Sequence, residues 1–262
     1  MVSMADFKPR FAPIAPIDIL EKMVEADYAG SFHLLLAHDV LEKKEDYNRV
    51  CYKIYSKNPK DYFVIMDNSL IELGEPLKPE QLLEACRITN ANVLVLPDKL
   101  SKGKETAIMS VEAAFEICST CFPPVGPPVA FLGVVQGKSE EECIECARVL
   151  ARIPVSYFSV PRITVKNLGT RKNLIIRLWQ EFKKPMHLLG FSDDLNDDIN
   201  CCRLPGVIGI DSAVPVRLGL DGRIMKQDTE VAKRKPDYLA KGKTYCPTVE
   251  GNVRWMKGLV ER

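Results

Sequence analysis

The sequence has almost no net charge, because 36 lysines and arginines stand against 35 aspartates and glutamates and leave a formal charge of +1. A global positive field is therefore excluded as the basis for binding a polynucleotide, and such a partner would have to meet a local basic patch. The composition is otherwise ordinary, with 46% hydrophobic and 27% charged residues. A chain of 262 residues is long enough for one large α/β domain or two small ones.

Signals for export or membrane insertion are also lacking. No uncharged apolar run reaches the roughly 18 residues that a membrane span needs. The N-terminal stretch "MVSMADFKPRFAPIAPIDIL" has no basic segment followed by an apolar one. We therefore expect a cytoplasmic chain without a membrane partner.

The nine cysteines include two CxxC pairs, Cys118/Cys121 and Cys143/Cys146, whose separation loosely resembles a zinc ribbon. The second pair falls in "SEEECIECARVLAR", whose periodicity places both cysteines on the apolar side of a helix. That placement is typical of reduced cysteines in a core. We expect no metal and no disulfide, with zinc binding as the alternative.

Apolar runs of strand length recur along the chain, separated by amphipathic stretches with helix-start signals. The runs cover residues 32–38, 62–67, 92–98, 130–136, 156–160, 186–191 and 207–211. The amphipathic stretches include "KPEQLLEACRITN", "KSEEECIECARVLAR", "TRKNLIIRLWQEFKK" and "SDDLNDDINCC". This alternation predicts a parallel sheet covered by helices on both faces.

The predicted fold class is α/β, a (β/α)8 TIM barrel that forms a single domain over residues 1–262. An open doubly wound sheet is the alternative, because no eighth strand is visible. From about residue 219 to residue 262 the composition changes, and this part is predicted to be a basic C-terminal extension.

Polar side chains end four of the predicted strands: Asp67, Asp98, Gln136 and Asp211. Any one such aspartate could simply cap the next helix. In a barrel, however, the carboxyl ends of all strands share one mouth, so the four side chains would converge. Carboxylates crowded in a partly apolar pocket can supply both a nucleophile and a proton acceptor. An aspartate beside a glutamine also suits the edge of a purine.

Three segments, "GVVQGK" (133–138), "HLLGF" (187–191) and "GIDSAVPVR" (209–217), resemble in order and spacing the motifs "VQGG", "YLMG" and "FDCVxPTR" of the tRNA-guanine transglycosylase superfamily. The resemblance covers roughly residues 62–217. It implies that Asp211 is the nucleophile, because Pro215 and Arg217 follow it as in the family motif. Asp67 then matches the aspartate of the family's "DSGGFQ" loop and would act as the general base.

The same resemblance implies a base-binding pocket. Asp98 and Gln136 would read the edge of the base, with Gly137, Ser69 and Glu72 beside them. Two departures from the family stand out: "YFSVPR" replaces the family's "GGLAVGE", and the zinc motif that follows the nucleophile in the tRNA enzymes is absent. The chain therefore looks more like the zinc-free branch, found in phages and bacterial genomic islands, that installs 7-deazaguanines in DNA.

The activity implied by the resemblance is base exchange without cofactor or metal. A guanine flipped out of DNA would be displaced when Asp211 attacks C1′ and forms a covalent aspartyl-sugar ester. A 7-deazaguanine, such as the 7-cyano form, would replace it after Asp67 removes its N9 proton. A tRNA substrate is the alternative partner, a homodimer is open, and a phage-encoded chain would act in the host cytoplasm.

Basic residues form two candidate clusters for backbone phosphates, although a solvated charged loop is an equally good interpretation of each residue. The first cluster is Arg162, Lys166, Arg171 and Lys172. The second follows the predicted nucleophile and includes Arg217, Arg223, Lys226, Lys233, Arg234, Lys235, Lys241 and Lys243.

The histidines are weaker signals. His33 and His38 flank the first apolar run, and His38 could reach the mouth, whereas His187 is predicted to lie at the closed end of the barrel. Two further function classes remain open: a nucleosidase or glycosidase for small molecules that uses Asp67 and Asp211, and a non-catalytic subunit that supports an active partner. Retention of all four polar strand ends argues against the second.

Overall fold

The computed structural model describes residues 8–120, 129–226, 229, 238–240 and 242–262. The strands are β1 (Arg10–Pro13), β2 (Phe32–Leu36), β3 (Phe63–Asp67), β4 (Val93–Val95), β5 (Ala130–Val134), β6 (Val155–Pro161), β7 (Met186–Leu189) and β8 (Val207–Ser212). The helices are α1 (Ile17–Glu25), α2 (Ala37–Glu42), α3 (Lys44–Lys57), α4 (Leu70–Leu73), α5 (Pro79–Thr89), α6 (Gly103–Thr120), α7 (Glu140–Leu150), α8 (Ile163–Leu168), α9 (Lys172–Phe182), α10 (Leu195–Cys202), α11 (Val214–Leu220) and α12 (Pro247–Val260).

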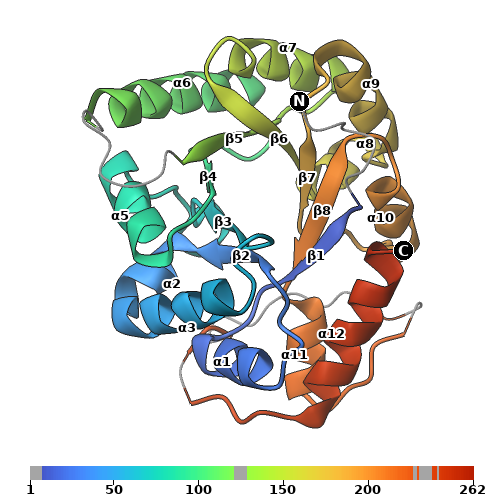
Figure 1. Ribbon diagram of the computed structural model, residues 1–262. Coiled ribbons are helices and arrows are strands. Elements are labelled where there is room, and N and C mark those ends of the chain that lie inside the picture. The colour runs from blue at the N-terminus through green and yellow to red at the C-terminus, as the bar shows by residue number, and fades with distance from the viewer. Residues whose placement is uncertain (1–7, 121–128, 227–228, 230–237, 241) are drawn as a thin grey trace.

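All eight strands belong to one parallel sheet in the order β1-β8-β7-β6-β5-β4-β3-β2. The two end strands of this order, β1 and β2, lie side by side, and the helices surround the strands (Figure 1). The chain is therefore a single-domain (β/α)8 barrel, and the open-sheet alternative is excluded. The carboxyl ends of the strands meet at one mouth, as the barrel prediction requires.

The strand that the sequence did not reveal is β1. It is only four residues long, has the sequence RFAP, and pairs with β8 from Arg10 opposite Gly209 to Pro13 opposite Ser212. An arginine at one end and a proline at the other hide the apolar pattern, because only Phe11 and Ala12 between them are fully buried and apolar. Short strands of this kind are recognised by pairing and not by periodicity.

Aromatic rings fill the barrel near the amino ends of the strands. Phe32 and Phe63 stack with their ring centroids 5.5 Å apart, and the guanidinium of Arg10 lies 4.5 Å from the Phe32 centroid. Gly209 permits this packing, because a Cβ there would stand 2.4 Å from the Arg10 carbonyl oxygen and 2.9 Å from the Phe32 ring. The opposite end of the barrel is left for the cavity described below.

The predicted C-terminal extension contributes part of the barrel wall. Helix α12 packs against α11 and β1 (Figure 1). Asn252 of α12 is buried and hydrogen-bonds the N–H of Met225 and the carbonyls of Pro215 and Arg223. Across the described residues, no helix has the length and apolar character needed to cross a membrane.

The second CxxC pair is buried in α7, as its spacing predicts. Burial raises the pKa of Cys143 to about 12 and that of Cys146 to about 11, so both thiols are protonated near neutral pH. Cys118 is exposed, and Cys121 lies outside the described residues. In the part of the chain that the structure describes, no three His, Cys, Asp or Glu side chains are grouped so as to hold a metal ion.

Candidate active site

A cavity of about 1200 Å³ opens at the carboxyl ends of the strands. Eight of the side chains singled out from the sequence line it: His38, Asp67, Glu72, Asp98, Gln136, Arg162, Asp211 and Arg217. Ser69 and Gly137 lie just outside its lining. The barrel therefore brings the four polar strand ends to one place, as their positions in the sequence predict.

Asp211 is the next-to-last residue of β8 and is 4% exposed. Its Oδ1 oxygen accepts hydrogen bonds from Nε2 of His187 at 3.0 Å and from the backbone N–H of Gly190 at 3.2 Å. Its Oδ2 oxygen accepts no hydrogen bond from any described residue. One oxygen is thus held in place while the other is available to a molecule in the cavity.

His187 lies inside the barrel below the cavity, which it does not line. Its ring packs on Phe32 near the amino ends of the strands, as its predicted place toward the closed end suggests, but its Nε2 reaches Asp211, which the sequence did not indicate. Strand β7 is only four residues long, and His187 pairs in register with Gly209, two residues before Asp211 on the same face of β8. The imidazole is fully buried, and its ring centroid is 5.8 Å from that of Phe32. When Asp211 is ionised, Nε2 carries the proton in this contact, because an ionised carboxylate can only accept.

Asp98 and Gln136 are hydrogen-bonded to each other in a closed network. Nε2 of Gln136 donates to Oδ2 of Asp98 at 2.7 Å, and Nδ2 of Asn68 donates to Oδ1 at 2.7 Å. Oε1 of the Gln136 side chain accepts the backbone N–H of Ser101 at 2.9 Å. Burial raises the pKa of Asp98, and the hydrogen bonds from Asn68 and Gln136 oppose that rise. This network joins the ends of three neighbouring strands.

Asp67 ends β3 and is partly exposed to the cavity. Its Oδ2 accepts the backbone N–H of Ser69 at 2.9 Å, which forms a tight turn with Ser69 in the left-handed region at φ 65°. The Ser69 hydroxyl in turn contacts Nδ1 of His38 at 2.9 Å. His38 lines the cavity, in agreement with its expected reach to the mouth.

Gly137 follows Gln136 where the chain meets the start of α7. A Cβ at this position would come within 2.6 Å of the Cys143 nitrogen and 2.9 Å of its sulfur, so the site accepts only glycine without movement. Its carbonyl accepts a hydrogen bond from Asn167 at 2.8 Å. Close packing against α7 thus explains why a glycine occupies this position.

Charged groups from α2 close one side of the cavity. The ammonium of Lys43 donates to Oδ1 of Asp39 and to the carbonyl of Leu239, both at 2.6 Å. Tyr47 donates to the other Asp39 oxygen at 2.5 Å. Both charges of this ion pair are almost fully buried, so it is a fixed part of the wall.

The predicted polynucleotide contacts are scattered. Arg217 is buried in the cavity wall, whereas Arg223 is exposed. Lys233, Arg234, Lys235 and Lys241 lie outside the described residues. A nucleic-acid partner and a homodimer stay predictions, because nothing in the structure bears on them.

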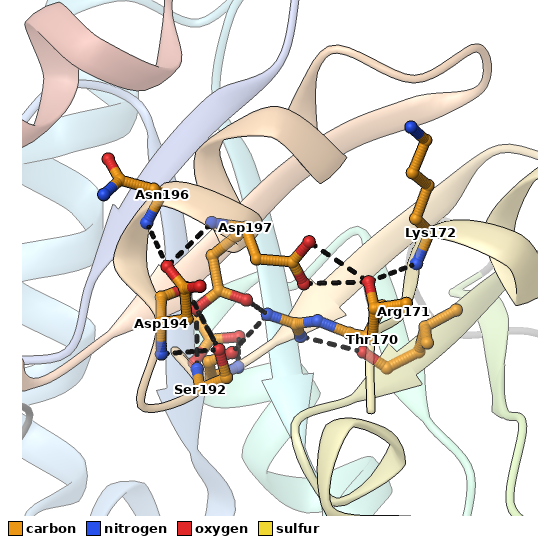
Figure 2. Close-up of polar contacts among 11 residues, drawn as sticks. Thr170, Arg171, Lys172, Ser192, Asp194, Asn196 and Asp197 are labelled. Carbon is orange, nitrogen blue, oxygen red and sulfur yellow. Dashed lines mark hydrogen bonds and ion pairs between the residues drawn. The ribbon is translucent and has the colours of Figure 1, made fainter. Parts of the chain in front are cut away.

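Arg171, placed in a surface cluster by the sequence, is fully buried and pairs with Asp198 of α10. Its guanidinium also donates to the carbonyls of Val160 and Gly190, at 3.2 and 3.0 Å. Figure 2 shows this network together with the hydrogen bonds from Thr170 to Asp197. The surface interpretation of Arg171 is wrong, because the residue ties two mouth loops together.

The sequence patterns missed two features of the site. One is Asn68, which hydrogen-bonds Asp98, and the other is the contact of His187 with Asp211. Asn68 directly follows the polar strand end Asp67, so a search extended by one residue would have found it. His187 stands early in a short strand, and no pattern in the sequence shows how far along the barrel axis that strand reaches.

No protein-family model matches the chain, and no curated protein does. Among solved structures it is similar to the YdjI aldolase from Escherichia coli K12, with a TM-score of 0.56 and 13% identity over 97% of this chain and 91% of that one. It is also similar to the 4-hydroxy-2-oxoglutarate aldolase/2-deydro-3-deoxyphosphogluconate aldolase from TTHB1, with a TM-score of 0.53 and 12% identity over 99% of both chains. A weaker likeness, at a TM-score of 0.49 and 10% identity, is to an enolase protein from the Sargasso Sea environmental genome, of which the chain spans 54%.

These comparisons contradict the predicted family. The barrels that the chain matches over nearly its whole length are aldolases by name, not transglycosylases. The predicted exchange of guanine for a 7-deazaguanine in DNA is therefore wrong, and its tRNA alternative finds no support. The geometry at the barrel mouth is consistent with this correction. Asp98 and Gln136, which were predicted to bind the edge of the base, are hydrogen-bonded to each other. The expectation of an enzyme agrees with neighbours that are enzymes on this fold.

Proposed function

We propose that this chain is an aldolase- or lyase-type enzyme that cleaves or forms a carbon–carbon bond next to a carbonyl group in a small molecule. The observation that carries the proposal is the half-held carboxylate of Asp211 at the barrel mouth. A buried carboxylate with one fixed oxygen and one available oxygen is suited to accept and return a proton. The aldolase names of two barrels similar in fold support this reaction type.

In the cleavage direction, Oδ2 of Asp211 takes the proton from the hydroxyl group that is β to the substrate carbonyl. The O–H electrons form the new carbonyl of the departing aldehyde, and the electrons of the broken carbon–carbon bond form an enolate. The Asp211 carboxyl then returns its proton to the enolate carbon. The proton and electrons balance without another reactant, and His187 keeps the carboxylate in one orientation throughout.

An amine mechanism, in which a lysine forms a Schiff base with the carbonyl, finds little support among the described residues of the mouth. Lys43 lines the cavity, but its ammonium is bonded to Asp39 and to the Leu239 carbonyl, so its nitrogen is not presented to a ligand. The proposal therefore places proton transfer on Asp211, in a cavity that also contains the cation of Arg217.

The test uses a panel of 2-oxo acids and 4-hydroxy-2-oxo acids in D2O, followed by proton NMR. We expect the signal of the protons next to the carbonyl to disappear by deuterium exchange, and hydroxylated members of the panel to yield an aldehyde. Asp211→Asn should slow both by about 10²- to 10⁴-fold, as for loss of a general base. Asp193→Asn, the same change at an exposed aspartate, should leave both rates unchanged.

Two results would refute the proposal. One is a folded wild-type protein that exchanges no proton on any member of the panel. The other is exchange that Asp211→Asn leaves intact, because the proton would then pass through another group.

A further inference from the structure

Arg217 is a buried cation without a counter-ion among the described residues. The side chain is 6% exposed, and its Nη2 atom is buried with no hydrogen-bond partner in that part of the chain. Only its backbone is engaged, through its N–H to Ala213 and its carbonyl to Asp221. The other fully buried arginine, Arg171, has Asp198 and two carbonyls as partners.

Such an arrangement is unfavourable for the protein alone. A buried charge is normally paired or hydrogen-bonded, because removal from water is costly. Burial lowers the pKa of the Arg217 guanidinium, and the nearby carboxylate of Asp221 only partly offsets this. An arginine nevertheless stays charged at neutral pH, so the site calls for an anion.

The place of Arg217 indicates where that anion would come from. The residue lies in α11, which begins directly after β8, and it lines the same cavity as Asp211 and Ser212. A ligand bound at the available oxygen of Asp211 is therefore in the same chamber as the guanidinium. The planar guanidinium can bind a carboxylate or a phosphate with two parallel hydrogen bonds.

The rest of the cavity limits what else the ligand carries. Six acidic side chains line it: Asp39, Glu42, Asp67, Glu72, Asp98 and Asp211. Asp39 and Asp98 already accept hydrogen bonds at both oxygens from other residues of the protein. The remaining carboxylates can accept hydrogen bonds from ligand hydroxyls and would repel an anionic group placed next to them. Lys43 does not offset them, because Asp39 already holds its ammonium. Arg162 also lines the cavity, but it is exposed, whereas the Arg217 guanidinium is buried.

We infer that the ligand of this cavity is a small hydroxylated anion, whose carboxylate or phosphate is bound by Arg217 while its hydroxyls face the acidic wall. This names the substrate class of the proposed lyase and rests on that proposal. Its test measures binding and not turnover, so that the two can fail separately.

The probes are three molecules with similar bodies: glycerate with a carboxylate, glycerol 3-phosphate with a phosphate, and neutral glycerol. Binding to the whole chain is measured by thermal unfolding and by isothermal titration calorimetry. We expect at least one anion to raise the melting temperature by several degrees at saturation, and glycerol to leave it unchanged. The anion that binds more tightly distinguishes the carboxylate from the phosphate.

Arg217→Gln should weaken anion binding at least tenfold, and its melting temperature without ligand should equal or exceed that of the wild type, because an unpaired buried charge is removed. Arg217→Lys keeps the charge but loses the two parallel hydrogen bonds, so its affinity for the anion should lie between those of the wild type and Arg217→Gln. Arg203→Gln, at an exposed arginine, controls for loss of surface charge and should bind like the wild type.

The inference is overturned if neither anion binds the wild type, or if Arg217→Gln binds the anions unchanged. Anion binding that depends on Arg217, without proton exchange in the panel of oxo acids, would overturn the proposed function alone. Proton exchange on a carbonyl substrate, without Arg217-dependent anion binding, would overturn this inference alone.

Discussion

At the scale of single residues, position inside the barrel separates aspartates that look alike in the sequence. Asp98 uses one hydrogen bond at each oxygen to join neighbouring strand ends. Asp211 keeps one oxygen available, because both of its donors, His187 and the Gly190 N–H, approach the other. The first arrangement suits a structural link and the second suits proton transfer.

A buried histidine away from the mouth predicts a pH effect on stability. His33 is fully buried, its Nε2 contacts the Gly30 carbonyl at 3.0 Å, and its Nδ1 has no partner among the described residues. Burial lowers its pKa to about 4, and the charges of Lys257 and Arg10 act in the same direction. The imidazole is therefore neutral in the folded protein at neutral pH.

The unfolded chain, with a histidine pKa near 6.5, binds a proton between about pH 6.5 and pH 4 that the folded protein does not. The contribution of His33 to the free energy of unfolding is thus complete above about pH 6.5 and is lost as pH falls toward 4. The loss should be on the order of 3 kcal/mol. Urea unfolding at pH 7 and pH 4.5 should show a smaller drop for His33→Gln than for the wild type, and equal drops would contradict the prediction.

At the scale of elements, one ion pair organises the loops at two strand ends. Arg171 precedes α9 and contacts Asp198 of α10, the end of β6 at Val160, and Gly190 after β7. Asp198 also accepts the N–H and the hydroxyl of Ser192, at 2.6 and 3.0 Å. The Gly190 N–H reaches Asp211, so this pair supports the backbone that orients the proposed base.

Breaking this pair should be costly, because it leaves a charge buried without a partner. We expect Arg171→Met to lower the free energy of unfolding by about 3–5 kcal/mol, and the double variant Arg171→Met/Asp198→Leu to lower it by less. Urea denaturation of the two variants and of Asp198→Leu would measure the coupling. Losses that simply add would show that the two side chains do not interact.

At the scale of the whole molecule, the C-terminal helix completes the barrel. Helix α12 lies against α11 and β1, so the last residues of the chain hold its first strand (Figure 1). Phe11 of β1 donates its N–H to Glu261 at 3.2 Å, and Lys257 donates to the carbonyls of Tyr28 and Ala29. The C-terminal helix thus holds both β1 and the segment that leads into β2.

Substitution of Asn252 should destabilise this contact strongly, because its side chain makes three buried hydrogen bonds. Asn252→Leu would leave the Met225 N–H and two carbonyls without their buried partner, and unsatisfied buried groups cost about 1–3 kcal/mol each. We expect the urea midpoint to fall by the equivalent of at least about 2 kcal/mol, with the slope unchanged. Glu250 lies on the same helix and forms an ion pair with the more exposed Arg254. Glu250→Gln should change the midpoint little, because ion pairs open to solvent contribute little to stability.

The sequence by itself indicated seven of the eight strands, because continuous apolar runs are local patterns. The strand ends are less exact: β4 ends at Val95 and β5 at Val134, so Asp98 and Gln136 follow their strands by three and two residues. The sequence also indicated that Asp67, Asp98, Gln136 and Asp211 share one mouth, since parallel strands in a barrel end at one face. It did not determine the reaction, because similar short motifs suggested a family that the comparisons contradict.

Only the tertiary structure decided how these side chains are used. The strand β1 exists through its pairing with β8, and the contact of His187 with Asp211 follows from the register of β7. Arg171 forms a buried ion pair with Asp198, whereas Nη2 of Arg217 is buried without a hydrogen-bond partner among the described residues. Hydrogen-bond partners and burial depend on which segments meet in space, and that information does not lie in the local order of residues.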